Sequence, residues 1–523
     1  MNTPRTGTSR MLRRVQQVAA HRRRPTVVTA WRERLPLLAS ALGVTGDEPA
    51  VNPSAVPALP AALDPTDPQH VWLALAVLSG RLPDETTVIE TTRACELDGI
   101  AALWDAVARI TTTESAAWDL KVVTDAVIVD VAHTISTGLS TGIQRVARET
   151  ARRWIAETDA IPVSWTRDFQ SIRQLTGRER ERLIRGYAVE DRALKPDARV
   201  VVPWRCTYLV PELAAEVERS TRLLPIARFS GNRTGVIGFD CVPLTSAETT
   251  QIGFSRLFTT NLAAVRWMDR VAAISDAAAT EYEGWRSMLA ATGLAGPRIA
   301  AVTLPVDFPE PTAEELADAH GRFVLPGNPL VLVVGSHEPR KNHLAILHAA
   351  ELLWRDGVGF SLTFVGGNAW GSDAFRARLT DLQRAGRPVD AVSKLPDSSL
   401  RAAYRLARCT VFPSFNEGYG LPVAESLAAG TPVVTSAFGS MADIAAAGGA
   451  LTVDPHDDHA IAAAMRALIT DDVLHATLAR QAKQRARRTW DTYAREAWDH
   501  LTGPGDDVTD QSRLHVDEAS AGA

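Results

Sequence analysis

The 523-residue chain is poor in cysteine, in excess charge and in long apolar runs. Its four cysteines, Cys95, Cys206, Cys241 and Cys409, stand far apart, which argues against a zinc site and is typical of a reducing compartment. The formal net charge of -5 argues against nucleic acid as the main partner. No apolar run is long enough to cross a bilayer, and the basic N-terminus lacks the apolar core and cleavage site of a secretion signal. We therefore expect a cytoplasmic protein and leave open a peripheral contact with the inner face of an anionic membrane.

The length allows two or more domains, and 46% hydrophobic with 22% charged residues is ordinary for a globular protein. Residues 1–24 form a basic arm, which we interpret as a solvated tail, with attraction to anionic lipid as the alternative. Residues 26–111 show mostly helical apolar spacing, interrupted by a proline-rich linker at 50–68. No chemical motif stands out in residues 1–120, so the role of this extension is not predicted. Residues 503–523 lack apolar periodicity and are predicted to be disordered.

The stretch on which the rest depends is 415–430, which reads FNEGYGLPVAESLAAG. The apolar run 409–412 before it predicts a buried strand, Pro422 suits the first turn of a helix, and Gly430 suits its end. The backbone N–H groups of Gly418, Tyr419, Gly420 and Leu421 would then face an anion at the helix N-terminus, a diphosphate above all. Glu417 and Glu425 flank that position, where carboxylates accept hydrogen bonds from sugar hydroxyls. The pattern favours a nucleotide sugar, although Glu425 taken alone is equally typical of an ordinary helix start.

The string NEGYGLPxxExxAxGTPV closely resembles the donor-site signature of the retaining glycosyltransferases of family 4, with its Glu-x7-Glu pair. The resemblance covers roughly residues 121–501 and is strongest from 330 to 440. It implies an α/β protein of the GT-B class, with two facing Rossmann-like domains. We expect an acceptor domain at 121–318, a nucleotide-sugar domain at 319–502, and the mostly helical extension in front of them.

A second stretch supports this interpretation. The apolar run 329–335 predicts a strand of a parallel sheet and is followed by SHEPRKNH. Two cations at a helix start oppose the helix dipole, so a binding role is favoured over a solvated surface. The sequence resembles the Glu-Pro-Arg-Lys-Asn variant of bacterial polysaccharide mannosyl- and deoxysugar transferases. That resemblance assigns Arg340 and Lys341 to the diphosphate of the donor, since Arg can bind bidentately and Lys acts as a point charge.

In the first domain, the strand at 126–131 leads through a loop with two glycines into a helix. The stretch resembles the family's first glycine loop, which lies against acceptor and donor sugar, and this implies contacts from Gly142, Gln144 and Arg145. A solvated helix face remains the alternative for Arg145. The family's strand usually ends in His-Asp-x-x-Pro, whereas this chain has Phe239 in place of the histidine. Asp240 is expected to bind a hydroxyl, with a turn role as the alternative.

Three further segments position these candidates. Ser275 is predicted to cap a helix and no ligand contact is expected from it. Residues 305–318 are interpreted as the linker between the domains, and 490–500 resembles the terminal helix that crosses back onto the first domain.

We therefore expect a retaining hexosyltransferase that uses a nucleotide diphosphate sugar, with the GDP-mannose type favoured over a UDP-sugar. The acceptor would be a hydroxyl of a glycan or a lipid-linked acceptor in surface polysaccharide synthesis. No metal and no cofactor besides the donor is expected, because no Asp-x-Asp or histidine cluster stands out. Glu417 would orient the sugar and Glu425 would hold the ribose. The alternatives are a non-catalytic GT-B scaffold or binding subunit, and an epimerase or phosphorylase of the same shape.

Overall fold

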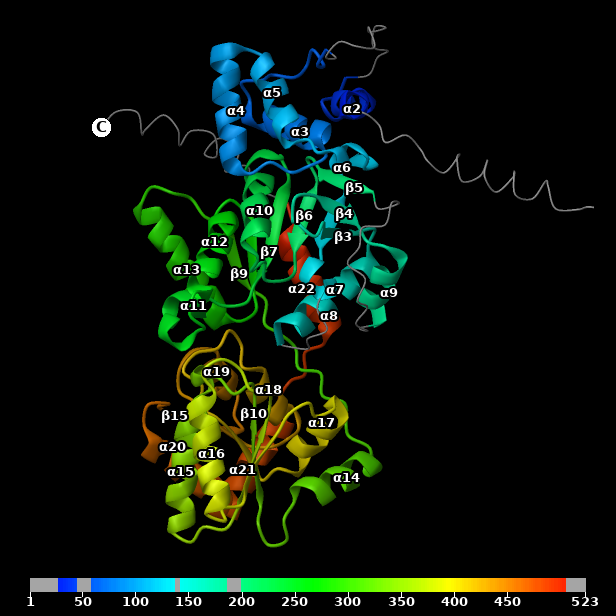
Figure 1. Cartoon of the computed structure of the whole chain (residues 1–523). Helices are drawn as coiled ribbons and strands as arrows, with labels where there is room; N and C mark the ends of the chain where they lie inside the picture. The colour runs from blue at the N-terminus through cyan, green and yellow to red at the C-terminus, as the bar shows by residue number, and fades with distance from the viewer. Residues whose placement is uncertain (1–26, 45–57, 137–141, 186–198, 505–523) are drawn as a thin grey trace, which may run out of the picture.

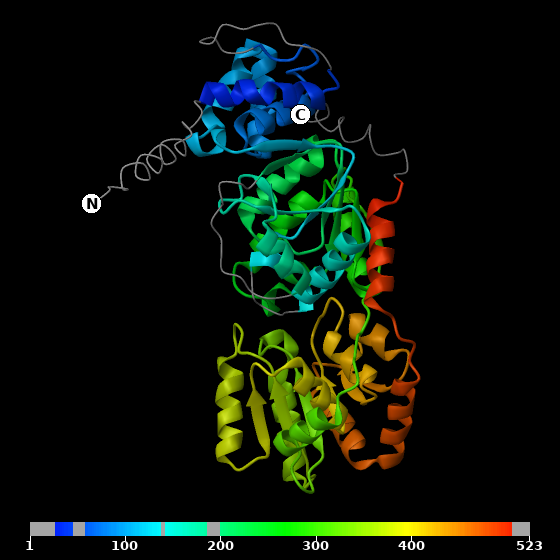
Figure 2. The ribbon, with the colours of Figure 1, turned by 90° about the vertical axis from the view of Figure 1, so that its right-hand side faces the viewer.

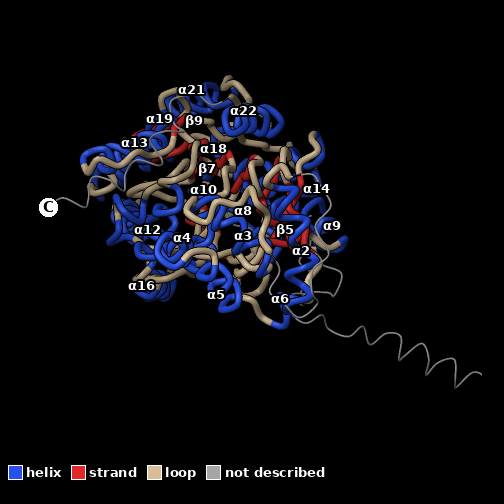
Figure 3. The backbone as a smooth tube through the Cα atoms, turned by 90° about the horizontal axis from the view of Figure 1, so that it is seen from above, coloured by secondary structure: helices blue, strands red, loops and turns tan. Residues whose placement is uncertain are grey.

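The computed structural model describes residues 27–44, 58–136, 142–185 and 199–504. A cap of helices sits on one end of a first α/β domain, and a second α/β domain lies at the opposite end (Figure 1). Seen from above, helices surround the strands (Figure 3). The basic arm at 1–24, residues 50–57 of the proline-rich segment, residues 137–141 of the first glycine loop and the tail from 505 onward lie outside the described residues.

The predicted helical extension is confirmed within the described residues. Asp67 caps the second of its helices by accepting a hydrogen bond from the Gln69 backbone, and Pro68 occupies the first turn. The cap shares one hydrophobic core with the first domain, and Trp72 stacks on Trp204 with 6.3 Å between the ring centroids. It lies at the end of the first domain that faces away from the second (Figures 1 and 2). Its helices are α2 (Val27–Ala41), α3 (Pro68–Ser79), α4 (Glu85–Asp98), α5 (Ala101–Ile110) and α6 (Thr113–Ala116).

The first domain is built on a nine-stranded sheet in the order β1-β5-β4-β3-β2-β6-β7-β8-β9. Its neighbouring strands are parallel except for β4, which is antiparallel to β3 and β5. The strands are β1 (Leu120–Val123), β2 (Val127–Asp130), β3 (Ile161–Trp165), β4 (Ile172–Gln174), β5 (Val200–Pro203), β6 (Thr207–Val210), β7 (Arg233–Gly238), β8 (Arg270–Ala273) and β9 (Arg298–Ala301). The helices are α7 (Ala132–Ser136), α8 (Gly142–Glu157), α9 (Gly177–Arg185), α10 (Val217–Phe229), α11 (Val242–Thr245), α12 (Phe254–Val265) and α13 (Asp276–Ala291).

The second domain has a six-stranded, all-parallel sheet in the order β12-β11-β10-β13-β14-β15. The order reverses between β10 and β13, and in such sheets ligands bind outside the carboxyl ends of the strands at that point. The strands are β10 (Leu330–Val334), β11 (Ser361–Val365), β12 (Val389–Val392), β13 (Cys409–Phe412), β14 (Val433–Ser436) and β15 (Ala450–Val453). The helices are α14 (Ala313–Phe323), α15 (His343–Arg355), α16 (Asp373–Arg384), α17 (Asp397–Leu406), α18 (Leu421–Ala428), α19 (Gly439–Ala445), α20 (Asp458–Thr470) and α21 (Asp472–Lys483), with a 3-10 turn η2 at Pro339–Lys341.

Two segments join the domains. The first runs from β9 to α14, and the second leads from α21 to α22 (Trp490–Thr502), which packs on the first domain (Figure 2). Trp154 Nε1 donates to the carbonyl of Ala494 at 2.8 Å. A Cβ at Gly235 of β7 would lie 2.9 Å from the Leu501 side chain, so the absence of a side chain lets α22 approach the sheet. The predicted return of the terminal helix is confirmed.

The prediction that the acidic residues 313–318 belong to the linker is wrong. Residues 313–318 form the start of α14, because Thr312 and Glu315 make a capping box that begins a helix there. The helix packs against α17 of the second domain, so the linker ends near Thr312. In the part of the chain that the structure describes, no helix has the length and apolar character needed to cross a membrane.

Candidate active site

The centre of the candidate site is an ion-pair cluster at the carboxyl ends of β10 and β13. The turn η2 after β10 presents Arg340 and Lys341, and the loop after β13 presents Glu417. Lys341 Nζ lies 2.5 Å from one carboxylate oxygen of Glu417, and an Arg340 guanidinium nitrogen lies 2.6 Å from the other. The fold therefore brings Glu417 to a pair of adjacent cations that lies about 76 positions earlier in the sequence.

Burial and mutual charge decide the protonation of this cluster. Burial by itself would raise the pKa of Glu417, but Arg340 and Lys341 outweigh it and lower the pKa to about 2. Burial lowers the pKa of Lys341, against the attraction of Glu417. Glu338 also pairs with Arg340 at 2.7 Å, and Ser414 Oγ donates to Glu417 at 2.7 Å. The side chains are thus held in fixed positions with an ionised carboxylate between two cations.

The loop from Gly418 to Leu421 lies directly against the first domain. Ser275 Oγ donates to the Gly418 carbonyl at 2.5 Å, and a Cβ at Gly418 would lie 2.2 Å from the Phe239 carbonyl oxygen. The predicted cap role of Ser275 is confirmed by its bond from the Ala278 backbone at 2.9 Å. Its contact with the loop was not predicted, because the contact joins two domains and leaves no local pattern in the sequence.

Gly418→Ala is expected to lower the rate of transfer about 100-fold. The added methyl group meets a backbone carbonyl that cannot rotate away, so the two domains must move apart by a fraction of an ångström or more. Such a displacement of reacting groups costs about two orders of magnitude in rate. Gly284→Ala on α13, where no atom lies within 4 Å, serves as the matched control. If steady-state kinetics show equal turnover for both variants, the close contact between Gly418 and the first domain is not required for transfer.

Asp240 lies beside the same loop. An added Cβ at Gly418 would lie 3.1 Å from its carboxylate oxygen Oδ2, so Gly418 lets the carboxylate approach the loop. Burial raises the pKa of Asp240 to about 6, and Glu281 and Glu417 add to the rise while Arg340 opposes it. Asp240 also accepts a hydrogen bond from the Val242 backbone at 3.2 Å, which is the turn role considered from the sequence. The two roles are compatible, since only one carboxylate oxygen makes that bond.

A second cluster surrounds Glu425 on α18. Arg145 from the first domain lies 3.1 Å from one of its carboxylate oxygens, and the Tyr404 hydroxyl donates to the other at 3.1 Å. Burial raises the pKa of Glu425, and Arg145 opposes the rise. At the start of α8, a Cβ on Gly142 would lie 3.0 Å from Leu421. Arg145 is therefore part of a contact between the domains and not only of a solvated helix face.

Two predicted site residues have side-chain partners outside the two ion-pair clusters. The Gln144 amide lies 3.2 Å from the His133 ring within the first domain. The Tyr419 hydroxyl donates to the Leu304 carbonyl in the linker at 2.9 Å. The backbone of Tyr419 belongs to the loop that precedes α18. Gly420, the next residue, has a φ of 96°, a left-handed conformation that favours glycine.

A buried charge network in the first domain was missed by the sequence analysis. Arg219 of α10 lies 2.9 Å from Asp130 at the end of β2 and 2.7 Å from Glu212 after β6. His133 pairs with Glu216 at 3.3 Å, and that hydrogen bond raises the pKa of His133. The strand order reverses between β2 and β6, so the network borders the crevice of this sheet. Its members lie up to about 90 positions apart in the sequence. The one local sign of the network is Asp130, a carboxylate at the end of a buried strand.

Across the described residues, no group of three or more His, Cys, Asp or Glu side chains is arranged to hold a metal ion.

Comparison with known sequences places a family domain within the second half of the chain. Residues 320–488 match the family model described as glycosyl transferases group 1. O-antigen chain mannosyltransferase B of Escherichia coli is 34% identical over 142 residues, which are 27% of this chain and 37% of that protein. A D-inositol 3-phosphate glycosyltransferase of Nocardiopsis dassonvillei is 32% identical over 231 residues, which are 42% of this chain and 52% of that protein. The match spans 37% and 52% of the length of these two relatives.

Solved structures share the architecture at low sequence identity. HepE of Anabaena in complex with UDP-glucose has a TM-score of 0.54 at 14% identity, over 72% of this chain and 100% of that chain. Sucrose-phosphate synthase of Thermosynechococcus elongatus has a TM-score of 0.53 at 16% identity, over 71% of this chain and 97% of that chain. These likenesses confirm the fold class that the sequence predicts. The chain therefore has the GT-B fold and carries a glycosyl transferases group 1 domain at residues 320–488.

Proposed function

We propose that this protein transfers a hexose, with mannose favoured, from a nucleotide diphosphate sugar to a hydroxyl of a glycan or lipid-linked acceptor, with retention of configuration. Cell-surface polysaccharide assembly is the process that this activity would serve. The observation that carries the proposal is the cluster of Arg340, Lys341 and Glu417 at the point where the strand order of the second sheet reverses. A scaffold that binds no nucleotide would have no physical need to bury two cations there.

The cations provide the electrostatic part of the reaction. When the bond between the sugar and the diphosphate breaks, negative charge develops on the leaving phosphate oxygen. Arg340, Lys341 and the N-terminus of α18 would stabilise that charge without reorganising, and the support for this role is that Glu417 holds both cations in fixed positions. The acceptor hydroxyl attacks from the same face and gives its proton to the departing phosphate oxygen. Glu417, ionised because its pKa is about 2, orients the sugar and steadies the positive charge of the oxocarbenium-like state.

Glu425 is the proposed ribose contact. Both of its carboxylate oxygens have partners, Arg145 on one and Tyr404 on the other. A ribose diol would replace the Arg145 contact, because that side chain is 40% exposed. Nucleotide binding would in this way be coupled to the ion pair between the domains.

The test combines binding with product analysis. Titration of the purified protein with GDP and UDP is expected to show tighter GDP binding, and tighter UDP binding would overturn the mannose preference. Incubation with a panel of nucleotide sugars and lipid-linked acceptors, followed by mass spectrometry and NMR, is expected to show a product with the anomeric configuration of the donor. An inverted product would refute retention, and nucleotide binding without turnover on the whole panel would favour the non-catalytic scaffold.

The dependence of kcat/KM on pH is expected to follow the ionisation of Asp240. Its ionised fraction rises as the pH passes through about 6, so a carboxylate that accepts a hydrogen bond from a sugar hydroxyl makes kcat/KM rise between pH 5 and 7. Asp240→Asn should remove this rise in kcat/KM. A rise that is unchanged in Asp240→Asn would mean that another group titrates.

The same titration affects stability. The folded protein holds the proton of Asp240 more tightly than the unfolded chain does, where the ordinary pKa is 3.8, so the free energy of unfolding falls as the pH rises from about 4 to 6.

A further inference from the structure

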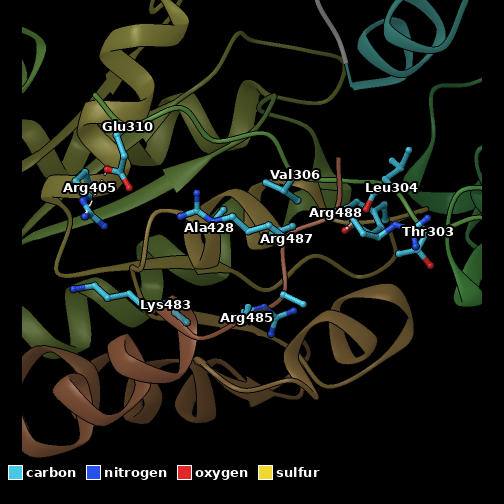
Figure 4. Close-up of a pocket in the computed structure, with 14 residues that line it drawn as sticks. Thr303, Leu304, Val306, Glu310, Arg405, Ala428, Lys483, Arg485, Arg487 and Arg488 are labelled. Carbon is cyan, nitrogen blue, oxygen red and sulfur yellow. Dashed lines mark hydrogen bonds and ion pairs between the residues drawn. The ribbon is translucent and has the colours of Figure 1, made fainter. Parts of the chain in front are cut away.

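A cavity of about 420 Å³ lies where the two segments that join the domains meet. Residues 303–310 of the linker form one wall, and residues 482–488 between α21 and α22 form another. Ala424 and Ala428 of α18 contribute small apolar side chains to it. We call this cavity the hinge pocket. Figure 4 shows Arg405 and Glu310 together at one end and Arg488 near Leu304 and Thr303 at the other.

The lining of the hinge pocket is strongly cationic. Among the residues that line it, Glu310 is the one carboxylate, and it lies 3.6 Å from Arg405. Arg488 pairs with Glu496 of α22. No acidic side chain in the described ranges pairs with the three remaining cations. The full set of cations is Arg405, Lys483, Arg485, Arg487 and Arg488.

Cations that share a cavity repel one another, and a bound polyanion relieves that repulsion. Arg485 is partly fixed for such a role, because it donates to the Gly448 carbonyl at 2.9 Å. Guanidinium groups match phosphoryl oxygens with two parallel hydrogen bonds, whereas an ammonium group adds a point charge. The volume lies within the range of small-molecule sites.

The hinge pocket also touches the active-site loop. Tyr419 lines the pocket, and its hydroxyl donates a hydrogen bond to the Leu304 carbonyl at 2.9 Å. Tyr419 stands between Gly418, which contacts the first domain, and Gly420, which caps α18. An occupant would therefore contact both joining segments and the residue that ties the loop to the linker.

We propose that the hinge pocket binds a phosphorylated ligand with at least two negative charges, of the size of a diphosphate or a sugar phosphate. This site is separate from the Arg340 and Lys341 cluster and shares only Tyr419 with the predicted donor loop. By bridging 303–310 and 482–488, the ligand stabilises the arrangement of the domains in which these segments lie together. Binding at the hinge pocket does not depend on which sugar the protein transfers.

The experiment is calorimetric titration of the full chain with pyrophosphate in the Arg340→Gln/Lys341→Met background, which weakens the donor cluster. One binding site should remain. Adding Lys483→Gln/Arg487→Gln should weaken it at least about tenfold, because two charge-assisted contacts are lost. The matched control adds Lys121→Gln/Arg384→Gln, which removes the same charge at exposed positions outside the pocket and should leave the affinity unchanged.

Two results would overturn the proposal: no residual pyrophosphate binding at millimolar concentration, or binding that the Lys483→Gln/Arg487→Gln pair does not weaken. Thermal unfolding of each variant verifies that the fold is kept. Sedimentation with vesicles that contain cardiolipin, a lipid whose headgroup carries two phosphates, separates the sources of the phosphoryl group. Co-sedimentation that the hinge pair abolishes identifies a lipid headgroup, and pyrophosphate binding without co-sedimentation identifies a soluble ligand. Failure of the proposed transferase activity would appear separately, in the GDP and UDP titrations and in the product analysis.

Discussion

Lys341→Met is expected to lower kcat for sugar transfer by about 100- to 1000-fold, the usual effect of removing one preorganised charge from a transition state. The Lys341 ammonium group lies 2.5 Å from Glu417 at the carboxyl end of β10, where the diphosphate of the donor is proposed to leave. Methionine keeps the length of the side chain and its packing beside the Phe412 ring, which is 4.9 Å from Nζ. Because Glu417 keeps Arg340 at 2.6 Å, its carboxylate stays paired and the fold should persist.

Lys121→Met, at an exposed position of β1 far from the cluster in the sequence and on the other domain, is the control and should retain full activity. Measurements of kcat, GDP affinity and unfolding temperature on both variants separate lost chemistry from lost folding. Turnover of Lys341→Met within about threefold of the parent protein would remove Lys341 from the site. A lowered unfolding temperature together with lost activity would instead assign it a structural role.

Arg219→Met is expected to lower the free energy of unfolding by about 3–5 kcal/mol, the cost of leaving buried carboxylates without their cation. The Arg219 side chain is fully buried and lies 2.9 Å from Asp130 and 2.7 Å from Glu212. For a domain of this size, the unfolding temperature should fall by roughly 6–20 °C. Asp130 keeps hydrogen bonds from Trp165 at 2.7 Å and Tyr208 at 2.9 Å, which hold its position but do not neutralise its charge.

The pH dependence of this variant gives a second measurement. Burial already raises the pKa of Glu212 and Arg219 opposes that rise, so without the guanidinium group the pKa of Glu212 rises further and the folded state binds more protons than the unfolded chain. The difference in free energy of unfolding between the parent protein and Arg219→Met should therefore become smaller as the pH falls from 8 to 5.5. Arg222→Met, one turn further along α10 with neutral Gln170 as hydrogen-bond partner at 2.7 Å, should cost much less. Equal losses for the two variants, or a deficit that does not change with pH, would contradict the electrostatic explanation.

The sequence and the structure differ most where contacts join distant segments. Local patterns indicate both Arg145 and Glu425 as site candidates, but nothing in either pattern shows that they form one ion pair across 280 positions. The helix cap accounts for Ser275 in the sequence, whereas its bond to Gly418 depends on the contact between the two domains. The acidity of residues 313–318 favours a linker, although Thr312 and Glu315 carry the capping-box pattern of a helix start.

What the sequence determined by itself is the set of local elements and the residue types at their ends. Alternation of apolar runs with glycine and proline fixes where β10, β13 and α18 begin and end, since hydrogen bonding and backbone sterics act between near neighbours. Only the tertiary structure decided which charges meet. The Arg219 network, the Asp240 environment and the hinge pocket depend on the order of strands and on the docking of two domains. The free energy of those arrangements is spread over many distant contacts, so no single stretch of sequence shows it.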